Sequence, residues 1–193
     1  MALKRSAQLT IVGVLLCALG ATPMAAAQTP AAPQPAPGGS PNIFYGQEVL
    51  GGGSASVLVF VHGLSGTASD WWVDNDMYQM ANAAGFRTAF VSLSRDNSRN
   101  SDDILPNAEV LRDAFPEIAA HFGVSQFYVI AHSKGGVDVQ AALMHTEITH
   151  LAKAVFTIAT PNSGTELSNW AFGPGNDLAK LLDALLPGVL LSP

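Results

Sequence analysis

From Val57 onwards, short apolar runs alternate with longer amphipathic segments. The run Val57–Val61 (VLVFV) is the pattern of a strand that is buried on both faces of a parallel sheet. The alternation continues to the end of this region and predicts helices over 70–84, 103–122 and 135–145 and strands over 86–93, 126–131 and 154–159. This order predicts an α/β fold with an open, doubly wound, mostly parallel sheet and helices on both faces.

The first 27 residues have the pattern of a signal peptide. Lys4 and Arg5 precede an almost wholly apolar stretch over 9–19, and three alanines at 25–27 supply a cleavage site. An uncleaved membrane anchor is the alternative, but the apolar stretch over 7–21 is shorter than the roughly 20 residues that span a bilayer. We therefore expect export, to the periplasm or the medium, after cleavage near residue 27.

Two further segments follow from composition. Residues 28–41 contain five prolines and almost no large apolar side chain, which predicts a semi-extended linker outside the core. Residues 42–193 are expected to form one α/β domain.

Charge and cysteine content exclude several classes of function. With 48% apolar residues, the 193-residue chain can bury a core. Nine Lys and Arg against fifteen Asp and Glu give a net charge of −6, which argues against nucleic acid binding. The one cysteine, Cys17, lies in the predicted signal peptide, and no Cys and His cluster has metal-ligand spacing. We expect no cofactor and no structural zinc, while a calcium site stays open.

The sequence AHSKGG over 131–136 joins a predicted strand directly to a predicted helix. Small residues, Ala131 and Gly135, flank Ser133 two positions away on either side. A turn this sharp strains the central residue and needs small neighbours, as in the nucleophile elbow G-x-S-x-G, here with alanine in the first position. The pattern predicts that Ser133 is a nucleophile at the carboxyl end of the sheet. A turn that merely links strand to helix is the alternative.

The first strand ends in HGLSG over 62–66, where glycines allow an amide N–H to face the space above the sheet. The amides of Leu64 and Lys134 are placed to form an oxyanion hole, which stabilises the oxygen that gains charge when an ester carbonyl becomes tetrahedral. A simple strand end is the alternative for His62 and Gly63.

Three stretches resemble the α/β-hydrolase family, and within it secreted bacterial lipases and esterases: VFVHGLSG (59–66), IAHSKGG (130–136) and TIATPNSGT (157–165). In such lipases the last segment commonly reads T-P-H-x-G-[ST], and Asn162 stands here in place of the histidine. The resemblance covers roughly residues 55–170, and residues 177–193 are similar to the start of the cap that covers the site in lipases. It implies the fold, a nucleophile at Ser133, an oxyanion hole from Leu64 and Lys134, and carboxylic ester substrates.

Family members carry the triad acid and then the histidine after the serine. The residues after 170 contain Asp177 and Asp183 but no histidine. None of the five histidines is expected to reach the Ser133 hydroxyl: His62, His121, His132, His145 and His150. Glu166 is a candidate for the acid. We otherwise expect the acid, the histidine and the C-terminal strands of the fold beyond residue 193.

The sequence thus predicts an exported serine hydrolase of lipase or esterase type, acting on small-molecule or lipid esters through an acyl-enzyme on Ser133. An incomplete hydrolase fold that binds acyl ligands without turnover is one alternative, and a thioesterase or acyltransferase is another. Contact with a membrane or lipid interface stays open, and the sequence indicates neither the acyl chain length nor the oligomeric state.

Overall fold

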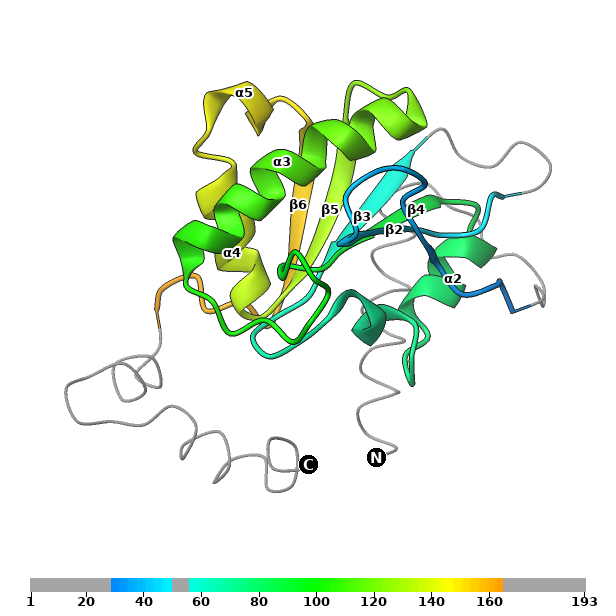
Figure 1. The fold of residues 1–193 in the computed structure, drawn as a ribbon, viewed down its shortest axis with the longest axis horizontal. Helices are drawn as coiled ribbons and strands as arrows, with labels where there is room; N and C mark the ends of the chain where they lie inside the picture. Colours follow the sequence, from blue (N-terminus) through cyan, green and yellow to red (C-terminus); the bar gives the residue numbers. More distant parts are fainter. Residues whose placement is uncertain (1–28, 50–55, 165–193) are drawn as a thin grey trace. The chain divides into compact units, whose positions relative to one another are not determined.

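The computed structural model describes residues 29–49 and 56–164 (Figure 1). The chain divides into two units, 1–160 and 161–193, and the second is described only as a turn in which the Gly164 N–H donates to the Pro161 carbonyl. The predicted signal peptide (1–27), the residues 177–193 assigned to a cap, and Glu166 lie outside the described residues. Within the described ranges, no helix is long and apolar enough to cross a membrane.

Within the described residues, six strands form one sheet in the order β1-β2-β4-β3-β5-β6. Their bounds are β1 (Gln34–Pro35), β2 (Ile43–Tyr45), β3 (Val57–Val61), β4 (Arg87–Val91), β5 (Phe127–His132) and β6 (Ala152–Ile158). Strands β4, β3, β5 and β6 run parallel, whereas β1 and β2 add to the β4 edge in antiparallel fashion. The mostly parallel, open sheet expected from the sequence is therefore confirmed.

Helices cover both faces of the sheet (Figure 1). They are the 3₁₀ helix η1 (Ala68–Trp71) and the α-helices α2 (Met77–Ala83), α3 (Ile104–Phe122), α4 (Lys134–Ala142) and α5 (Thr146–Thr149). Alternate residues of β3 serve the two faces: Val59 packs in the cluster under α3 and α4, and Phe60 in the cluster under η1 and α2. All five residues of β3 are buried, as the continuous apolar run predicts.

Helix α3 has the predicted boundaries to within one residue. Asp103 precedes it in an extended conformation, and Gly123 ends it in the left-handed conformation with φ of 63°. Its buried face includes Leu111, Phe115 and Ile118, at the three- and four-residue spacing of an amphipathic helix. Apart from the predicted helix over 70–84, the other predicted elements are present with ends shifted by no more than three residues.

The single helix predicted over 70–84 is wrong, because only its second half is α-helical. Asp74 has a φ of 52°, which a helix does not allow. The Asn75 side chain donates to the Asp70 carbonyl at 2.7 Å and accepts from the Met77 N–H at 2.9 Å. These local bonds between a side chain and the backbone compete with helix formation and delay the start of α2 to Met77.

The N-terminal segment predicted as a linker packs against the sheet from residue 31 onwards. Strand β1 pairs with β2, and the Ala31 carbonyl accepts a hydrogen bond from the Tyr78 hydroxyl at 2.9 Å. Ser40 binds the Glu117 carboxylate on α3 through both its amide and its hydroxyl, at 3.0 and 2.8 Å. No residue of 29–41 belongs to the buried hydrophobic core, and both residues of β1 are exposed. Strand pairing and polar contacts nevertheless attach this segment to the domain, although it lacks large apolar side chains.

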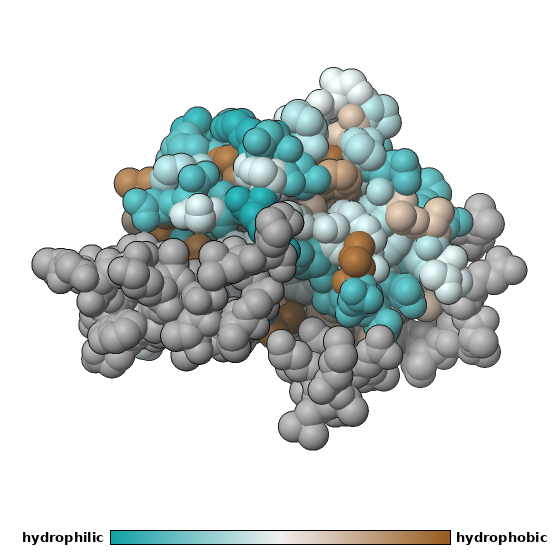
Figure 2. Space-filling view, turned by 60° about the horizontal axis from the view of Figure 1, so that its bottom comes forward, coloured by the Kyte–Doolittle hydropathy of each residue, from teal (hydrophilic) through white to brown (hydrophobic). Residues whose placement is uncertain are grey.

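Hydrophilic residues cover much of the face drawn in Figure 2, interrupted by separate hydrophobic patches. The exposed large apolar side chains among the described residues are Val73, Ile104, Leu105 and Met144. Isolated apolar residues of this kind are normal on protein surfaces and indicate no site by themselves.

Candidate active site

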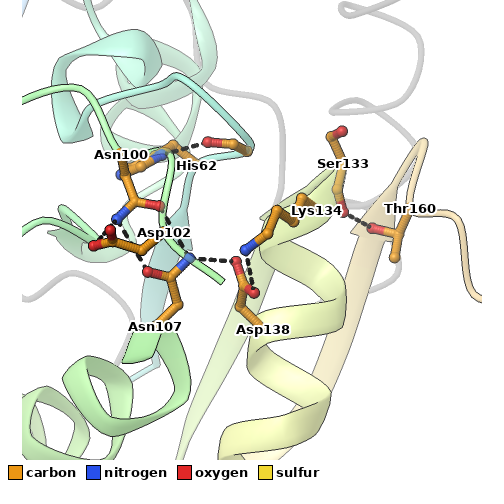
Figure 3. Close-up of polar contacts among 9 residues, drawn as sticks. His62, Asn100, Asp102, Asn107, Ser133, Lys134, Asp138 and Thr160 are labelled. Carbon is orange, nitrogen blue, oxygen red and sulfur yellow. Dashed lines mark hydrogen bonds and ion pairs between the residues drawn. The ribbon is translucent and has the colours of Figure 1, made fainter. Parts of the chain in front are cut away.

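Ser133 lies between the end of β5 and the start of α4 with φ of 53° and ψ of −131°. A non-glycine residue in this region costs about 1–3 kcal/mol and persists only where its surroundings hold it. Here the Ser133 N–H donates to the Ile158 carbonyl at 2.8 Å, and the Ser133 carbonyl accepts from the Thr160 hydroxyl at 2.9 Å (Figure 3). Among the described residues, the Ser133 hydroxyl itself has no hydrogen-bond partner.

Glycines allow the backbone around Ser133 to pack closely. A Cβ atom on Gly135 would lie 2.1 Å from the carbonyl oxygen of His62, and one on Gly63 would lie 2.9 Å from the Cβ of Ser133. Both separations are shorter than van der Waals contact. The turn after β5 therefore sits directly against the end of β3, and any side chain at Gly135 would force the two apart.

His62 is buried at the end of β3 and bonds to the backbone through both ring nitrogens. The Leu93 N–H donates to Nε2 at 2.9 Å, so the ring proton lies on Nδ1, which donates to the Gly63 carbonyl at 2.8 Å. Burial is the main cause that lowers the pKa of His62, so the ring is neutral. Both ring nitrogens of His62 are thus occupied by backbone groups, so its contacts in this structure are structural.

The carbonyl of Gly63 also accepts from the Gly66 N–H at 3.2 Å. No described peptide bond is cis, so the Leu64 N–H points away from the Gly63 carbonyl oxygen, which accepts both of these hydrogen bonds. Lys134 supplies the first N–H of α4, which has no acceptor within the helix. Neither the Leu64 nor the Lys134 N–H donates to any of the described residues. Both amides are thus available to an external oxygen.

Backbone strain gathers at this edge of the sheet. Ser65, Ser133 and Ala159 have φ of 57°, 53° and 52° and follow the carboxyl ends of β3, β5 and β6. Strained non-glycine residues are characteristic of functional sites in folded proteins. The three neighbouring strand ends therefore mark this edge, independently of sequence motifs, as the candidate site.

A cavity of about 170 Å³ opens beside this edge. It is lined by His62, Gly63, Asp70, Trp71, Asn75, Met77, His132 and Ile158. Apolar cavities of about 150 Å³ bind a molecule the size of benzene, so this volume suits a short acyl chain or a single ring. Its walls come from η1, from Asn75 and the first residue of α2, and from the strand ends.

Solved structures of bacterial hydrolases are similar to this chain. The lipase BlEst2 of Bacillus licheniformis, in its mature form, is 34% identical with a TM-score of 0.62, over 72% of this chain and 56% of that chain. The chain has the α/β-hydrolase fold. The propeptide form of BlEst2 is 35% identical with a TM-score of 0.60, over 67% of this chain and 28% of that one. Est1E from Butyrivibrio proteoclasticus shares only 16% identity at a TM-score of 0.50, over 67% and 50%, and likewise shows the fold.

The family resemblance expected from the sequence is therefore confirmed, while the chain spans only 28% and 56% of the two BlEst2 chains. No protein-family model and no curated protein matches it.

In this α/β-hydrolase fold, the described residues do not place a base or an acid on the serine. His121 stacks on Tyr45 with ring centroids 3.6 Å apart, and His145 faces Glu109 and Glu147. Glu166, Asp177 and Asp183 lie outside the described residues. Nor do three or more His, Cys, Asp or Glu side chains gather anywhere in 29–49 or 56–164 to hold a metal ion.

One feature of the site escaped the sequence analysis. Asn100, Asn107 and Asp138 form a buried polar cluster beside the turn at Ser133 (Figure 3). The available signal was polar side chains at positions that the helical pattern assigns to the core, such as Asn107 next to Ala108 on the buried face of α3.

Proposed function

We propose that this chain carries the nucleophile of an exported serine hydrolase that acts on carboxylic esters, as lipases and esterases do. The observation that carries this proposal is the strained Ser133 at a strand-to-helix turn, next to the free amides of Leu64 and Lys134. The similarity to a Bacillus lipase at 34% identity supports a hydrolase.

In the proposed reaction, the Ser133 Oγ attacks the acyl carbon while a histidine base takes the hydroxyl proton. The carbonyl oxygen becomes negatively charged and accepts hydrogen bonds from the amides of Leu64 and Lys134, and removal of one such donor typically costs about 10²–10³ in rate. The C–O bond to the alcohol breaks, and the alcohol leaves with the proton. Water then hydrolyses the acyl-enzyme. The triad acid and histidine belong to residues other than those described.

The volume and the lining of the cavity bear on the substrate. The cavity of about 170 Å³ lies beside the serine turn and has both apolar walls, Trp71 and Met77, and polar ones. This favours esters with a small acyl group, whether the ester is a small molecule or a lipid.

The decisive experiment is covalent labelling of the purified protein with a fluorophosphonate probe, followed by turnover of p-nitrophenyl butyrate. Ser133→Ala should abolish both signals. Ser125→Ala is the matched control, because Ser125 is exposed and precedes β5 at the other end of the strand. Labelling that survives in Ser133→Ala would show that another residue is the nucleophile.

A second function, acyl binding without turnover, is favoured by the lack of a base bonded to Ser133 among the described residues. A folded protein that binds a fatty acid but neither labels nor hydrolyses the ester would establish it.

Export is tested separately. N-terminal sequencing of the protein from a secreting host should give Gln28 as the first residue, whereas an intact Met1 terminus would contradict cleavage.

A further inference from the structure

The buried cluster beside Ser133 consists of side chains from three elements. Asn100 lies in the loop before α3, Asn107 in the first half of α3 and Asp138 in α4, and their exposed fractions are 1%, 0% and 0%. Polar groups at this depth are costly unless every one is hydrogen-bonded.

The hydrogen bonds within the cluster use every side-chain amide proton. Asn100 and Asn107 form a reciprocal pair, with each Nδ2 donating to the other's Oδ1 at 3.0 Å. The second proton of Asn107 goes to Asp138 Oδ2 at 3.0 Å, and the second proton of Asn100 goes to Asp102 Oδ2 at 3.3 Å (Figure 3). Two side-chain amides with four donor protons are thereby satisfied.

At one end, this cluster holds the loop after β3. The Asn100 carbonyl accepts from the Ser65 N–H at 2.7 Å, and the Asn100 N–H donates to the Gly66 carbonyl at 3.2 Å. The Arg99 guanidinium also donates to the Ser65 carbonyl at 3.0 Å. The backbone immediately after Leu64 is therefore fixed on Asn100.

At the other end, the cluster holds the first turn of α4. Lys134 Nζ bonds to Asp138 Oδ1 at 2.8 Å, and the two residues lie one helical turn apart. Burial raises the pKa of the Asp138 carboxyl, an effect that the hydrogen bond and charge of Lys134 oppose. The continuous chain of bonds thus runs from Ser65 to Lys134.

We infer that Asn100, Asn107 and Asp138 are positioning residues, which set the spacing between the Leu64 and Lys134 amides. This inference rests on the proposed function, in which these two amides bind one oxygen. The Leu64 amide lies in the loop after β3 and the Lys134 amide at the start of α4. A side-chain link between these two elements therefore fixes the distance between the two amides. A buried ion pair adds little net stability compared with well-packed apolar residues, which favours a geometric role for this one.

The test uses Asn107→Leu, which keeps the branched shape of the side chain but removes three hydrogen bonds of the cluster. Glu117→Leu is the matched control, since it lies on the same helix and removes two hydrogen bonds to Ser40. If Asn107→Leu does not fold, Asn107→Ala removes the same bonds with less bulk.

Two readouts separate positioning from stability. Hydrogen exchange of the Ser65 amide should accelerate about tenfold or more in the Asn107 variant relative to Glu117→Leu, while amides of β5 stay protected in both. The kcat for p-nitrophenyl butyrate should fall about 10- to 100-fold, with KM changed less than about twofold.

Unchanged Ser65 exchange would overturn the inference, whatever the activity. Equal kcat in Asn107→Leu and Glu117→Leu, with wild type active and Ser133→Ala inactive, would also overturn it and leave the proposed function intact. A wild-type protein that does not label contradicts the proposed function instead, and the exchange rates then still decide whether the cluster holds the loop.

Discussion

The His62 ring forms hydrogen bonds with both the Gly63 carbonyl and the N–H of Leu93, two residues after the end of β4. Its Nδ1–H donates to the Gly63 oxygen at 2.8 Å, while its Nε2 accepts from the Leu93 N–H at 2.9 Å. Only the neutral tautomer with the proton on Nδ1 makes both bonds, because a protonated ring has no acceptor. The orientation of the Gly63–Leu64 peptide is therefore coupled to the charge state of a buried histidine.

Stability should depend on pH through His62. Its folded pKa is lowered by burial, so the unfolded chain binds the proton more readily. The contribution of His62 to the free energy of unfolding is fully present above the unfolded pKa of about 6.5. It is lost as the pH falls below that value, by no more than about 1.4 kcal/mol per pH unit. Urea unfolding from pH 8 to pH 5 measures this slope.

The control is His62→Gln, measured over the same range, because it retains all other titrating groups. Asp138 acts in the opposite direction: its raised pKa makes the folded state bind a proton more tightly as pH falls. The difference between wild type and variant cancels that contribution. Identical slopes in the two proteins would show that His62 does not protonate on unfolding.

Ser133→Gly should stabilise the fold while it abolishes ester hydrolysis. Glycine adopts the φ of 53° without the penalty of about 1–3 kcal/mol that a side chain incurs, whereas Ser133→Ala keeps the strain. We expect the glycine variant to have the higher Tm of the two. At Ser125, which has no positive φ, the order should reverse. A glycine variant less stable than the alanine variant at Ser133 would argue that the turn is unstrained.

Gly135→Ala should destabilise the protein and reduce labelling of Ser133. The added methyl group would meet the His62 carbonyl oxygen, and because both are backbone-anchored, α4 must move away from β3. Overpacking of this kind costs about 1–3 kcal/mol. Gln140→Ala, at an exposed position of α4, also removes a hydrogen bond to the Gly136 carbonyl but adds no atoms against β3, so it should cost less than Gly135→Ala in the same denaturation assay. Equal stability of both variants would contradict the close approach.

Tyr78→Phe tests whether the N-terminal segment is attached to the domain. The Tyr78 hydroxyl donates to the Ala31 carbonyl at 2.9 Å and accepts from the Gln47 N–H at 2.8 Å, and its loss should cost about 1–3 kcal/mol. Proteolysis within residues 29–41 should become faster. Tyr128→Phe is the control and should change neither, since Tyr128 contacts Lys153 and Phe156 through its ring. A protease-sensitive N-terminus in wild type would contradict the attachment.

The central strands and helices could be predicted because the residues that determine each of them lie within or next to the element itself. The apolar run of β3, and the left-handed Gly123 after α3, act within a few residues of themselves. The turn at Ser133 was predictable for the same reason, since its small neighbours lie two positions away. The roles of Ser133, Leu64 and Lys134 remain predictions.

Other features depended on contacts between distant residues. Strand β1 forms in a proline-rich segment because Gln34 and Pro35 meet β2, and neither residue favours a strand by itself. Asn107 and Asp138 are 31 positions apart, so the helical pattern can mark Asn107 as a polar residue at a core position but cannot show which residue is its partner. The late start of α2 does not depend on distant residues, because it follows from the local hydrogen bond between Asn75 and Met77. The helical periodicity of residues 70–84 nevertheless predicts a single helix there.

The position of β3 between β4 and β5 has a consequence for the order of folding. Val59 pairs with Ala89 on one side and with Val129 on the other, which lies 70 positions later in the chain. Contacts over such separations form slowly, because a long loop must close first. The loop after β3 and the turn after β5 meet only at this step. A chain that crosses a membrane unfolded would therefore carry no assembled nucleophile site, and the site would arise only at its destination.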